Sequence, residues 1–240
     1  GLGDVYKRQD KQNREKDAVA NMRKEFSANV SHELKTPLTS ISGYAEIMKD
    51  GLVRPEDMKT FSERIYNEAS RLITLVEDIM KLSKLDEGAV ELEKEEVDFY
   101  MLTREICSRL APQAEKRHVR VEVTGEPVHY LGVRQVLDEM LYNMIENAIK
   151  YNKEGGLVSV WVGNTLQGIK IIVRDTGIGI PKEEQERIFE RFYRVDKSHS
   201  KATGGTGLGL SIVKHGALMH GAKIDVDSEV NKGTKMELIF

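Results

Sequence analysis

The stretch "VLDEMLYNMIENAIKY", residues 136–151, combines an apolar stripe with a polar edge at helical spacing. The stripe consists of Val136, Leu137, Met140, Leu141, Met144, Ile145, Ala148 and Ile149. The polar edge consists of Glu139, Asn143, Asn147 and Lys150, at spacings of three and four residues. Residues so spaced lie on one side of a helix, so the stretch predicts a helix that buries one face and keeps a polar edge beside it.

The segments on either side of this helix predict a small sheet. Before it we expect a helix over about residues 100–116 and strands at "HVRVEV" and near "VHYL". After it we expect strands at "GLVSVWVG" and "GIKIIVRD", a helix over about residues 208–220, and strands at "AKIDVDS" and "TKMELIF". Alternating strands and helical periods in this order predict an α+β sandwich over residues 98–240, with helices on one face of a mixed sheet.

The N-terminal part has helical periodicity throughout. Apolar residues recur every three or four positions from about Val19 to Met48, and again from Phe61 to Ile79. The break "DGLVRPED" carries Gly51, suited to a helix end, and Pro55, suited to a helix start. Residues 19–87 thus predict a helical hairpin. Its stripes would be covered by dimerisation into a four-helix bundle or, alternatively, by packing on the chain's own second domain.

The remaining segments and the composition limit the classes of function. Residues 1–18 are interpreted as a truncated upstream linker or scar, and residues 88–97 as a linker with a short strand. Lys and Arg number 36 against 39 Asp and Glu, which argues against nucleic acid as a partner. No apolar run reaches the roughly 18–20 residues that span a bilayer. The single cysteine, Cys107, cannot form an intrachain disulfide and is expected to pack as a small apolar residue.

The segment "SANVSHELKTPL", residues 27–38, places Pro37 inside a helical pattern. Proline there costs roughly 3 kcal/mol, because its ring removes a backbone hydrogen bond and meets the preceding turn. His32 lies just over one turn earlier and Glu33 follows it. Pro37 is therefore either a tolerated kink or part of a bent helix that carries a reactive histidine.

Two glycine-containing segments in the second domain offer a nucleotide site. In "DTGIG", Asp175 leaves an apolar strand, either as a turn residue or as an acceptor for the exocyclic amine of adenine. In "GGTGLGLSIVKH", residues 204–215, glycines precede a helix N-terminus, where backbone N–H groups favour phosphate. Neither the P-loop nor the Rossmann spacing occurs. The amide oxygens of Asn143 and Asn147 suit Mg²⁺, although two exposed asparagines are also common on their own.

Five segments in one order carry a resemblance to a known family. "SHELKTPL", "NMIENAIKY", "DTGIG", "FERFYRVD" and "GGTGLGL" resemble the H, N, G1, F and G2 boxes of bacterial sensor histidine kinases, and the likeness extends from about residue 20 to the end. "FYRVD" and "KTPLTSISGYAEIM" are most similar to orthodox membrane sensor kinases of the phosphate-regulon type. The resemblance implies an ATP-binding domain of the histidine kinase and Hsp90-like type after the dimeric hairpin.

The resemblance also implies residue roles. His32 is similar to the phosphoacceptor and Glu33 to its acidic neighbour, while Thr36 either orients water in a phosphatase step or is only a polar residue before Pro37. Asn147 would bind Mg²⁺ with Asn143 in support. The other implied nucleotide-site residues are Lys150, Tyr151, Asp175, Gly177, Gly179, Arg194, Gly205, Thr206, Gly207, Leu208 and Gly209.

The function implied by the resemblance is autophosphorylation of His32 by ATP with Mg²⁺, followed by transfer to an aspartate of a response regulator. A homodimer is implied, as is a parent protein anchored in the bacterial membrane with this region in the cytoplasm. One alternative is a nucleotide-binding regulatory module that mainly docks or dephosphorylates a regulator. Another is a chaperone or topoisomerase-type ATPase, which the "SHELKTP" helix disfavours.

Overall fold

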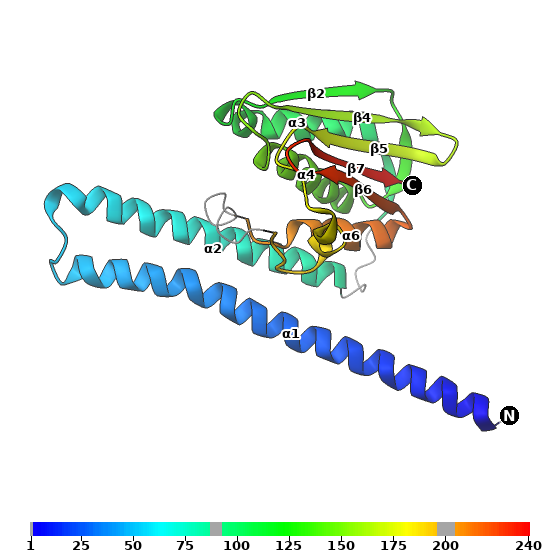
Figure 1. Ribbon diagram of the computed structural model, residues 1–240, viewed down its shortest axis with the longest axis horizontal. Helices are drawn as coiled ribbons and strands as arrows, with labels where there is room; N and C mark the ends of the chain where they lie inside the picture. Colours follow the sequence, from blue (N-terminus) through cyan, green and yellow to red (C-terminus); the bar gives the residue numbers. More distant parts are fainter. Residues whose placement is uncertain (1, 87–92, 196–204) are drawn as a thin grey trace. The chain divides into compact units, whose positions relative to one another are not determined.

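The computed structural model describes residues 2–86, 93–195 and 205–240 (Figure 1). The chain forms two compact units, Gly1–Glu77 and Asp78–Phe240. The expected linker at 88–97 lies partly outside the described residues, and residues 196–204, before the second glycine segment, lie wholly outside them. Among the described helices, none is long and apolar enough to cross a membrane.

The first unit is built from α1 (Leu2–Lys49), the short 3-10 helix η1 (Pro55–Asp57) and most of α2 (Met58–Asp86). Gly51 ends α1 with a positive φ of 70°, and Leu52 N–H donates to the carbonyl of Ile47 at 3.1 Å. These are the features of a glycine-capped helix end. The rings of Tyr44 and Phe61 meet edge to face at 5.6 Å, so the predicted hairpin is confirmed.

α1 begins at Leu2, earlier than the predicted start near Val19. The residues before Val19 are mostly lysine, arginine, glutamine, glutamate and aspartate, which give no apolar periodicity to detect. Most of these residue types have good intrinsic helix propensity, so a helix forms there although no apolar periodicity predicts it. Residues 2–18 are thus helical, where the sequence was interpreted as an upstream linker or scar.

The second unit has one main sheet and one small one. The main sheet has the order β2-β4-β5-β7-β6, and the small sheet pairs β1 with β3. β2 runs parallel to β4, and the other neighbours in the main sheet are antiparallel. The strands are β1 (Glu95–Asp98), β2 (Arg120–Gly125), β3 (His129–Gly132), β4 (Leu157–Thr165), β5 (Gly168–Asp175), β6 (Lys223–Glu229) and β7 (Gly233–Ile239). The predicted mixed sheet is confirmed.

The helices α3 (Phe99–Lys116), α4 (Arg134–Lys150) and α6 (Gly209–His220) lie on one face of the main sheet (Figure 1). Asp98 begins α3 by accepting hydrogen bonds from the N–H groups of Tyr100 and Met101 at 2.9 and 3.1 Å. In the described part of the segment between β5 and α6 lie the short 3-10 helices η2 (Lys182–Glu184) and η3 (Arg187–Phe189).

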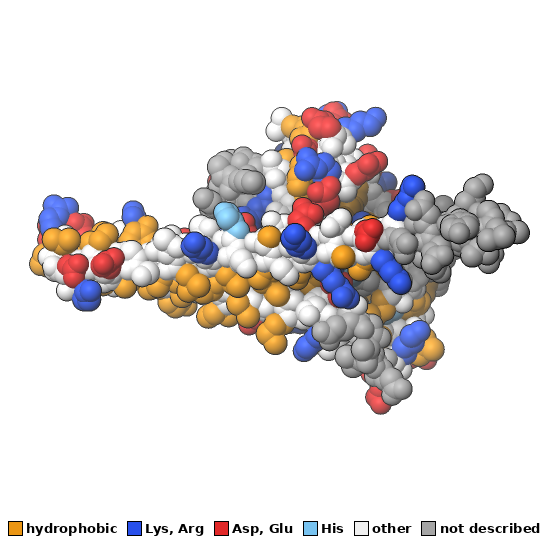
Figure 2. Space-filling view, turned by 90° about the horizontal axis from the view of Figure 1, so that it is seen from below, with side chains coloured by type: hydrophobic (Ala, Val, Ile, Leu, Met, Phe, Trp, Pro, Cys, Tyr) orange, Lys and Arg blue, Asp and Glu red, His pale blue; other side chains and the backbone are white. Residues whose placement is uncertain are grey.

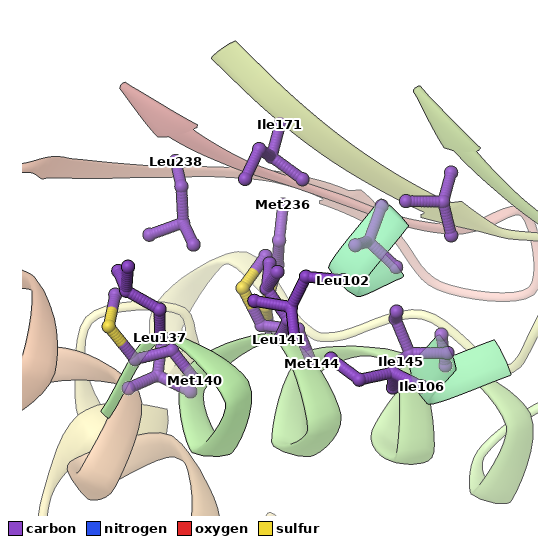
Figure 3. Close-up of a cluster of buried hydrophobic side chains, with 14 of the residues drawn as sticks. Leu102, Ile106, Leu137, Met140, Leu141, Met144, Ile145, Ile171, Met236 and Leu238 are labelled. Atoms are coloured by element: carbon purple, nitrogen blue, oxygen red, sulfur yellow. The ribbon is translucent and has the colours of Figure 1, made fainter. Parts of the chain in front are cut away.

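The core of the second unit lies between these helices and the sheet. Every member of the predicted α4 stripe is buried, as expected from its spacing. Figure 3 shows Leu137 and Leu141 of α4 and Leu102 of α3 beneath Ile171 and Leu238 of the sheet. Each such side chain contributes about 1.5–3 kcal/mol by leaving water. This burial holds α4 in one rotation about its axis, so its polar edge has a fixed position.

Cys107 on α3 also behaves as predicted. Its thiol is partly buried, and burial raises its pKa to about 11. The side chain is therefore a neutral packing group near neutral pH.

Candidate functional site

His32 stands on the surface of α1 with 80% of its side chain exposed. Glu33 is less exposed, at 25%, and its Oε1 lies 4.0 Å from Nδ1 of His32. An imidazole whose Nδ1 faces a carboxylate favours a proton on that nitrogen, which leaves Nε2 with a lone pair. The arrangement can supply an accessible nitrogen nucleophile.

The helix continues through Pro37, which is buried within the first unit. Proline cannot donate a backbone hydrogen bond to the preceding turn. Nearby, the hydroxyl of Thr36 donates to the carbonyl of His32 at 3.2 Å. Ser31 and Thr39 donate in the same way to the carbonyls of Ser27 and Lys35. Hydroxyl groups that donate to the carbonyl four residues earlier slightly destabilise a helix and often bend it. The turns around His32 carry such side-chain hydrogen bonds in addition to those of the backbone.

The polar edge of α4 faces the glycine segment that precedes α6. Asn143 donates from Nδ2 to the carbonyl of Glu139 at 2.8 Å, and its Oδ1 lies beside Gly209. Nζ of Lys150 is 5.5 Å from the ring centre of Tyr151, and both side chains lie close to Gly205. Burial lowers the pKa of Lys150. The predicted edge therefore gathers amide and ammonium groups beside the start of a helix.

Asp175 lies at the end of β5, where it is largely buried. Its Oδ1 accepts hydrogen bonds from Gly177 N–H at 2.8 Å and Thr234 N–H at 3.2 Å. Burial raises the pKa of this carboxyl to about 6, against the lowering effect of the two N–H donors. Both bonds end on Oδ1, so Oδ2 is the oxygen left to accept from a ligand.

The loop after Asp175 needs its glycines. A Cβ at Gly177 would meet the carbonyl of Tyr151, and a Cβ at Gly179, where φ is 70°, would meet the carbonyl of Glu229. Only glycine combines this close approach with a positive φ at low cost. Gly177 therefore lets the loop pass close to the end of α4, and Gly179 lets it pass close to the end of β6.

The second glycine segment leads into α6. Gly207 has a φ of 76°, and its carbonyl accepts from Phe192 N–H at 2.9 Å. Arg194 Nη2 donates to the carbonyl of Thr206 at 3.0 Å. Leu208 is buried and anchors the first turn, since its carbonyl accepts from Ile212 N–H at 3.0 Å. The first N–H groups of a helix have no partner within the helix and favour an anion.

Within the second unit, Asn143, Lys150 and Tyr151 thus lie close to the glycine segment, and Tyr151 also lies close to Gly177. Asn147 lies on α4 between Asn143 and Lys150. His32, Glu33 and Thr36 belong to the first unit. Sequence reasoning missed four further residues near the site. These are Asn152, Thr176, Thr234 and Asp78, whose Oδ2 accepts from the hydroxyl of Thr206 at 2.6 Å. Of these four, only Asn152 could have been singled out from the sequence, because it is a polar residue directly after the predicted helix.

A buried carboxylate, a polar helix edge and a glycine-led helix start on one α+β sandwich define a nucleotide-binding domain of the ATPase type. Residues 132–240 match the family described as histidine kinase-, DNA gyrase B-, and HSP90-like ATPase. Residues 22–88 match the His Kinase A (phospho-acceptor) domain. The chain belongs to the sensor histidine kinases, and it contains their transmitter region. The family prediction is confirmed.

Relatives and solved structures agree with this assignment. The chain is 40% identical over 219 residues to the sensor-like histidine kinase SenX3 of Mycolicibacterium smegmatis, covering 90% of this chain and 56% of that protein. It is 38% identical to the sensor histidine kinase WalK of Bacillus subtilis, covering 92% and 37%. The chain thus spans about half the length of SenX3 and less of WalK.

Among solved structures, a mycobacterial sensor histidine kinase, MprB, is 30% identical, with a TM-score of 0.54 over 60% of this chain and 95% of that one. The histidine kinase ThkA in complex with the response regulator protein TrrA is 27% identical, with a TM-score of 0.69 over 89% and 60%.

Proposed function

We propose that this chain is the catalytic transmitter of a sensor kinase, which transfers the γ-phosphoryl group of ATP to His32 and then to an aspartate of a response regulator. The observation that carries this proposal is the exposed His32 beside Glu33 in a chain that also holds a nucleotide site. Incubation with γ-labelled ATP and Mg²⁺ tests it. Acid-labile, base-stable label on the protein is expected, whereas bound ATP without any label would contradict the proposal.

In the first step, the lone pair on Nε2 of His32 attacks the γ-phosphorus. A P–N bond forms as the bond from phosphorus to the bridging oxygen breaks, and ADP leaves with that electron pair. The developing positive charge on the ring is stabilised by Glu33 near Nδ1. In the second step, the P–N bond breaks as a regulator carboxylate takes the phosphoryl group.

The nucleotide is held from three sides in this proposal. Oδ2 of Asp175 accepts from the adenine amino group, and Tyr151 lines the site. The phosphates are faced by Lys150, by Arg194 and by the backbone of Gly205, Thr206, Gly207, Leu208 and Gly209. Phosphoryl transfer depends mainly on such positioning and charge neutralisation.

Mg²⁺ would be held by the amide oxygen of Asn147, with Asn143 supporting a bound water. Among the described residues there is no cluster of three or more His, Cys, Asp or Glu side chains suited to a metal. Mg²⁺ fits the amides nevertheless, because it uses few protein ligands and completes its shell with phosphate and water. When bound, it would neutralise charge between the phosphates.

Replacement of Asn147 by alanine is expected to lower autophosphorylation by about 10- to 100-fold and to raise the Mg²⁺ concentration needed for half-maximal rate. The measurement is the initial labelling rate over a Mg²⁺ titration. Asn164→Ala is the matched control, because Asn164 is exposed near the end of β4. An unchanged Mg²⁺ dependence in the Asn147 variant would remove this residue from the metal site.

ATP affinity is expected to fall as the pH is lowered through about 6, by up to about tenfold per pH unit. The free protein protonates Asp175 in this range, and the protonated carboxyl loses its charge as an acceptor. Titration of ATP and of purine riboside triphosphate at several pH values isolates the effect. The two nucleotides share the same phosphate titration, so only ATP should lose affinity relative to its analogue.

A homodimer is also proposed. Figure 2 shows hydrophobic side chains gathered along the hairpin helices of the first unit. Val19, Met22, Leu38 and Ile73 are each more than half exposed in the single chain. A second copy would cover such side chains in a four-helix bundle. Sedimentation should therefore give twice the chain mass.

The partner proposed for the phosphorylated form is the receiver domain of a response regulator. Transfer requires direct approach of the regulator to His32, whose side chain is 80% exposed. We also propose a phosphatase step, in which Thr36, one turn after His32, would orient the attacking water. The relatives are named sensors, and we propose a membrane-anchored signal input with this region in the cytoplasm.

The domain limits are likewise proposals. Residues 19–87 are proposed as the phosphoacceptor unit and residues 98–240 as the catalytic domain, with 88–97 between them. The compact units of the structure divide at Glu77, because the last turns of α2 group with the second unit.

A further inference from the structure

A closed set of hydrogen bonds joins Asn152, the second residue after α4, to Thr176, the residue after Asp175. The hydroxyl of Thr176 donates to Oδ1 of Asn152 at 3.2 Å and accepts from Leu157 N–H at 2.9 Å. Asn152 Nδ2 and Thr176 N–H both donate to the carbonyl of Leu157, each at 3.1 Å. Two side chains and the first residue of β4 thus form one bridge, called here the Asn152–Thr176 bridge.

The bridge connects the two halves of the nucleotide site. Asn152 follows Tyr151 at the end of the helix that carries the polar edge, and Thr176 follows Asp175. The carbonyl of Tyr151 accepts from Ile178 N–H at 3.1 Å, so a backbone bond runs parallel to the bridge. The separation between the Asp175 carboxylate and the polar edge of α4 is therefore set by this short connection.

The bridge also bears on the orientation of the carboxylate itself. Oδ1 of Asp175 is held by Gly177 N–H, and the peptide that carries this N–H begins at Thr176. If Thr176 shifts, the Gly177 N–H shifts with it, and Oδ1 then keeps only the longer bond from Thr234 N–H at 3.2 Å, so the carboxylate is held less firmly. Oδ2 would then leave the position from which it accepts.

We propose that Asn152 and Thr176 are positioning residues for recognition of the purine 6-amino group, which act by fixing the Asp175 carboxylate relative to α4. This inference rests on the proposed function, in which Asp175 contacts adenine. The same bonds also secure the start of β4. If this structural role were their only one, their loss would weaken binding of every purine nucleotide to the same degree.

The test compares ATP with purine riboside triphosphate, which lacks only the 6-amino group, by calorimetric titration into the full chain. Thr176→Val keeps the shape of the side chain but removes both hydrogen-bonding roles of the hydroxyl. We expect this variant to bind ATP about tenfold more weakly, which corresponds to the loss of about one oriented hydrogen bond. Its affinity for the analogue should change by less than about twofold. Thr176→Ser should restore the preference for ATP, and Asn152→Ala should lower it.

Thr165→Val is the matched control. Its hydroxyl donates to the carbonyl of Gly168 at 2.9 Å, at the other end of the β4–β5 hairpin, and the variant should keep the full preference. Equal weakening of both nucleotides by Thr176→Val would overturn the proposal. If that variant does not fold, Asn152→Ala decides in the same way. Equal binding of both nucleotides by the unaltered chain would instead overturn the adenine assignment of Asp175 and the bridge proposal with it.

Discussion

Replacement of His32 by glutamine is expected to abolish autophosphorylation, with a labelling rate at least about 1,000-fold below that of the unaltered chain. Glutamine retains polarity and approximate length but has no nitrogen lone pair that can attack phosphorus. His32 is 80% exposed on α1, so its loss removes no packing and the hairpin should stay folded. The measurement is retention of label from γ-labelled ATP, tested for acid lability.

The specificity of this result depends on two controls. His129→Gln changes another exposed histidine, with 55% of its side chain accessible on β3, and should label at the normal rate. ATP binding by His32→Gln should be unchanged, because the nucleotide residues lie in the other unit. Acid-labile label persisting in the His32 variant would place the phosphoacceptor elsewhere.

Much of this architecture follows from periodicity in the sequence. The stripe from Val136 to Ile149 predicted α4 and its buried face, and the strand "GIKIIVRD" coincides with β5. These elements are predictable because each buries one face of a regular element, which leaves a repeat of fixed period. The end of α1 at Gly51 was predictable for a related reason, because only glycine takes its φ of 70° cheaply.

Other contacts left little trace in the sequence. Thr234 holds Asp175 through its backbone N–H, which every residue except proline possesses, so no side-chain type marks the contact. Thr176 and Asn152 meet across the site from positions 24 residues apart, and each alone resembles an ordinary turn residue. The N-terminal turns of α1 depend on helix propensity without an apolar stripe.

Asp175 illustrates how function opposes stability in this fold. Its pKa is raised from 3.8 to about 6 by burial, so the folded chain binds the proton more readily than the unfolded chain does. This residue's contribution to stability is therefore greatest below pH 3.8 and is lost as the pH rises through about 6. At neutral pH the unliganded fold carries a buried charge at a net cost, and contact with a ligand donor would offset it.

Replacement of Asp175 by asparagine is therefore expected to weaken ATP binding by about 100-fold or more while leaving the unliganded chain at least as stable at pH 7. Asparagine has one acceptor oxygen, and the N–H groups of Gly177 and Thr234 would occupy it. Its amide N–H₂ would then face the adenine amino group, donor against donor, and leave both unsatisfied.

Two measurements on this variant separate recognition from folding. Calorimetric titration with ATP gives the affinity, and the thermal midpoint without nucleotide gives the stability. Asp225→Asn, at an exposed position on β6, removes the same charge and should preserve ATP binding. Full ATP affinity in the Asp175 variant would show that the carboxylate does not contact adenine. A lower thermal midpoint would show that its two N–H bonds outweigh the burial of its charge.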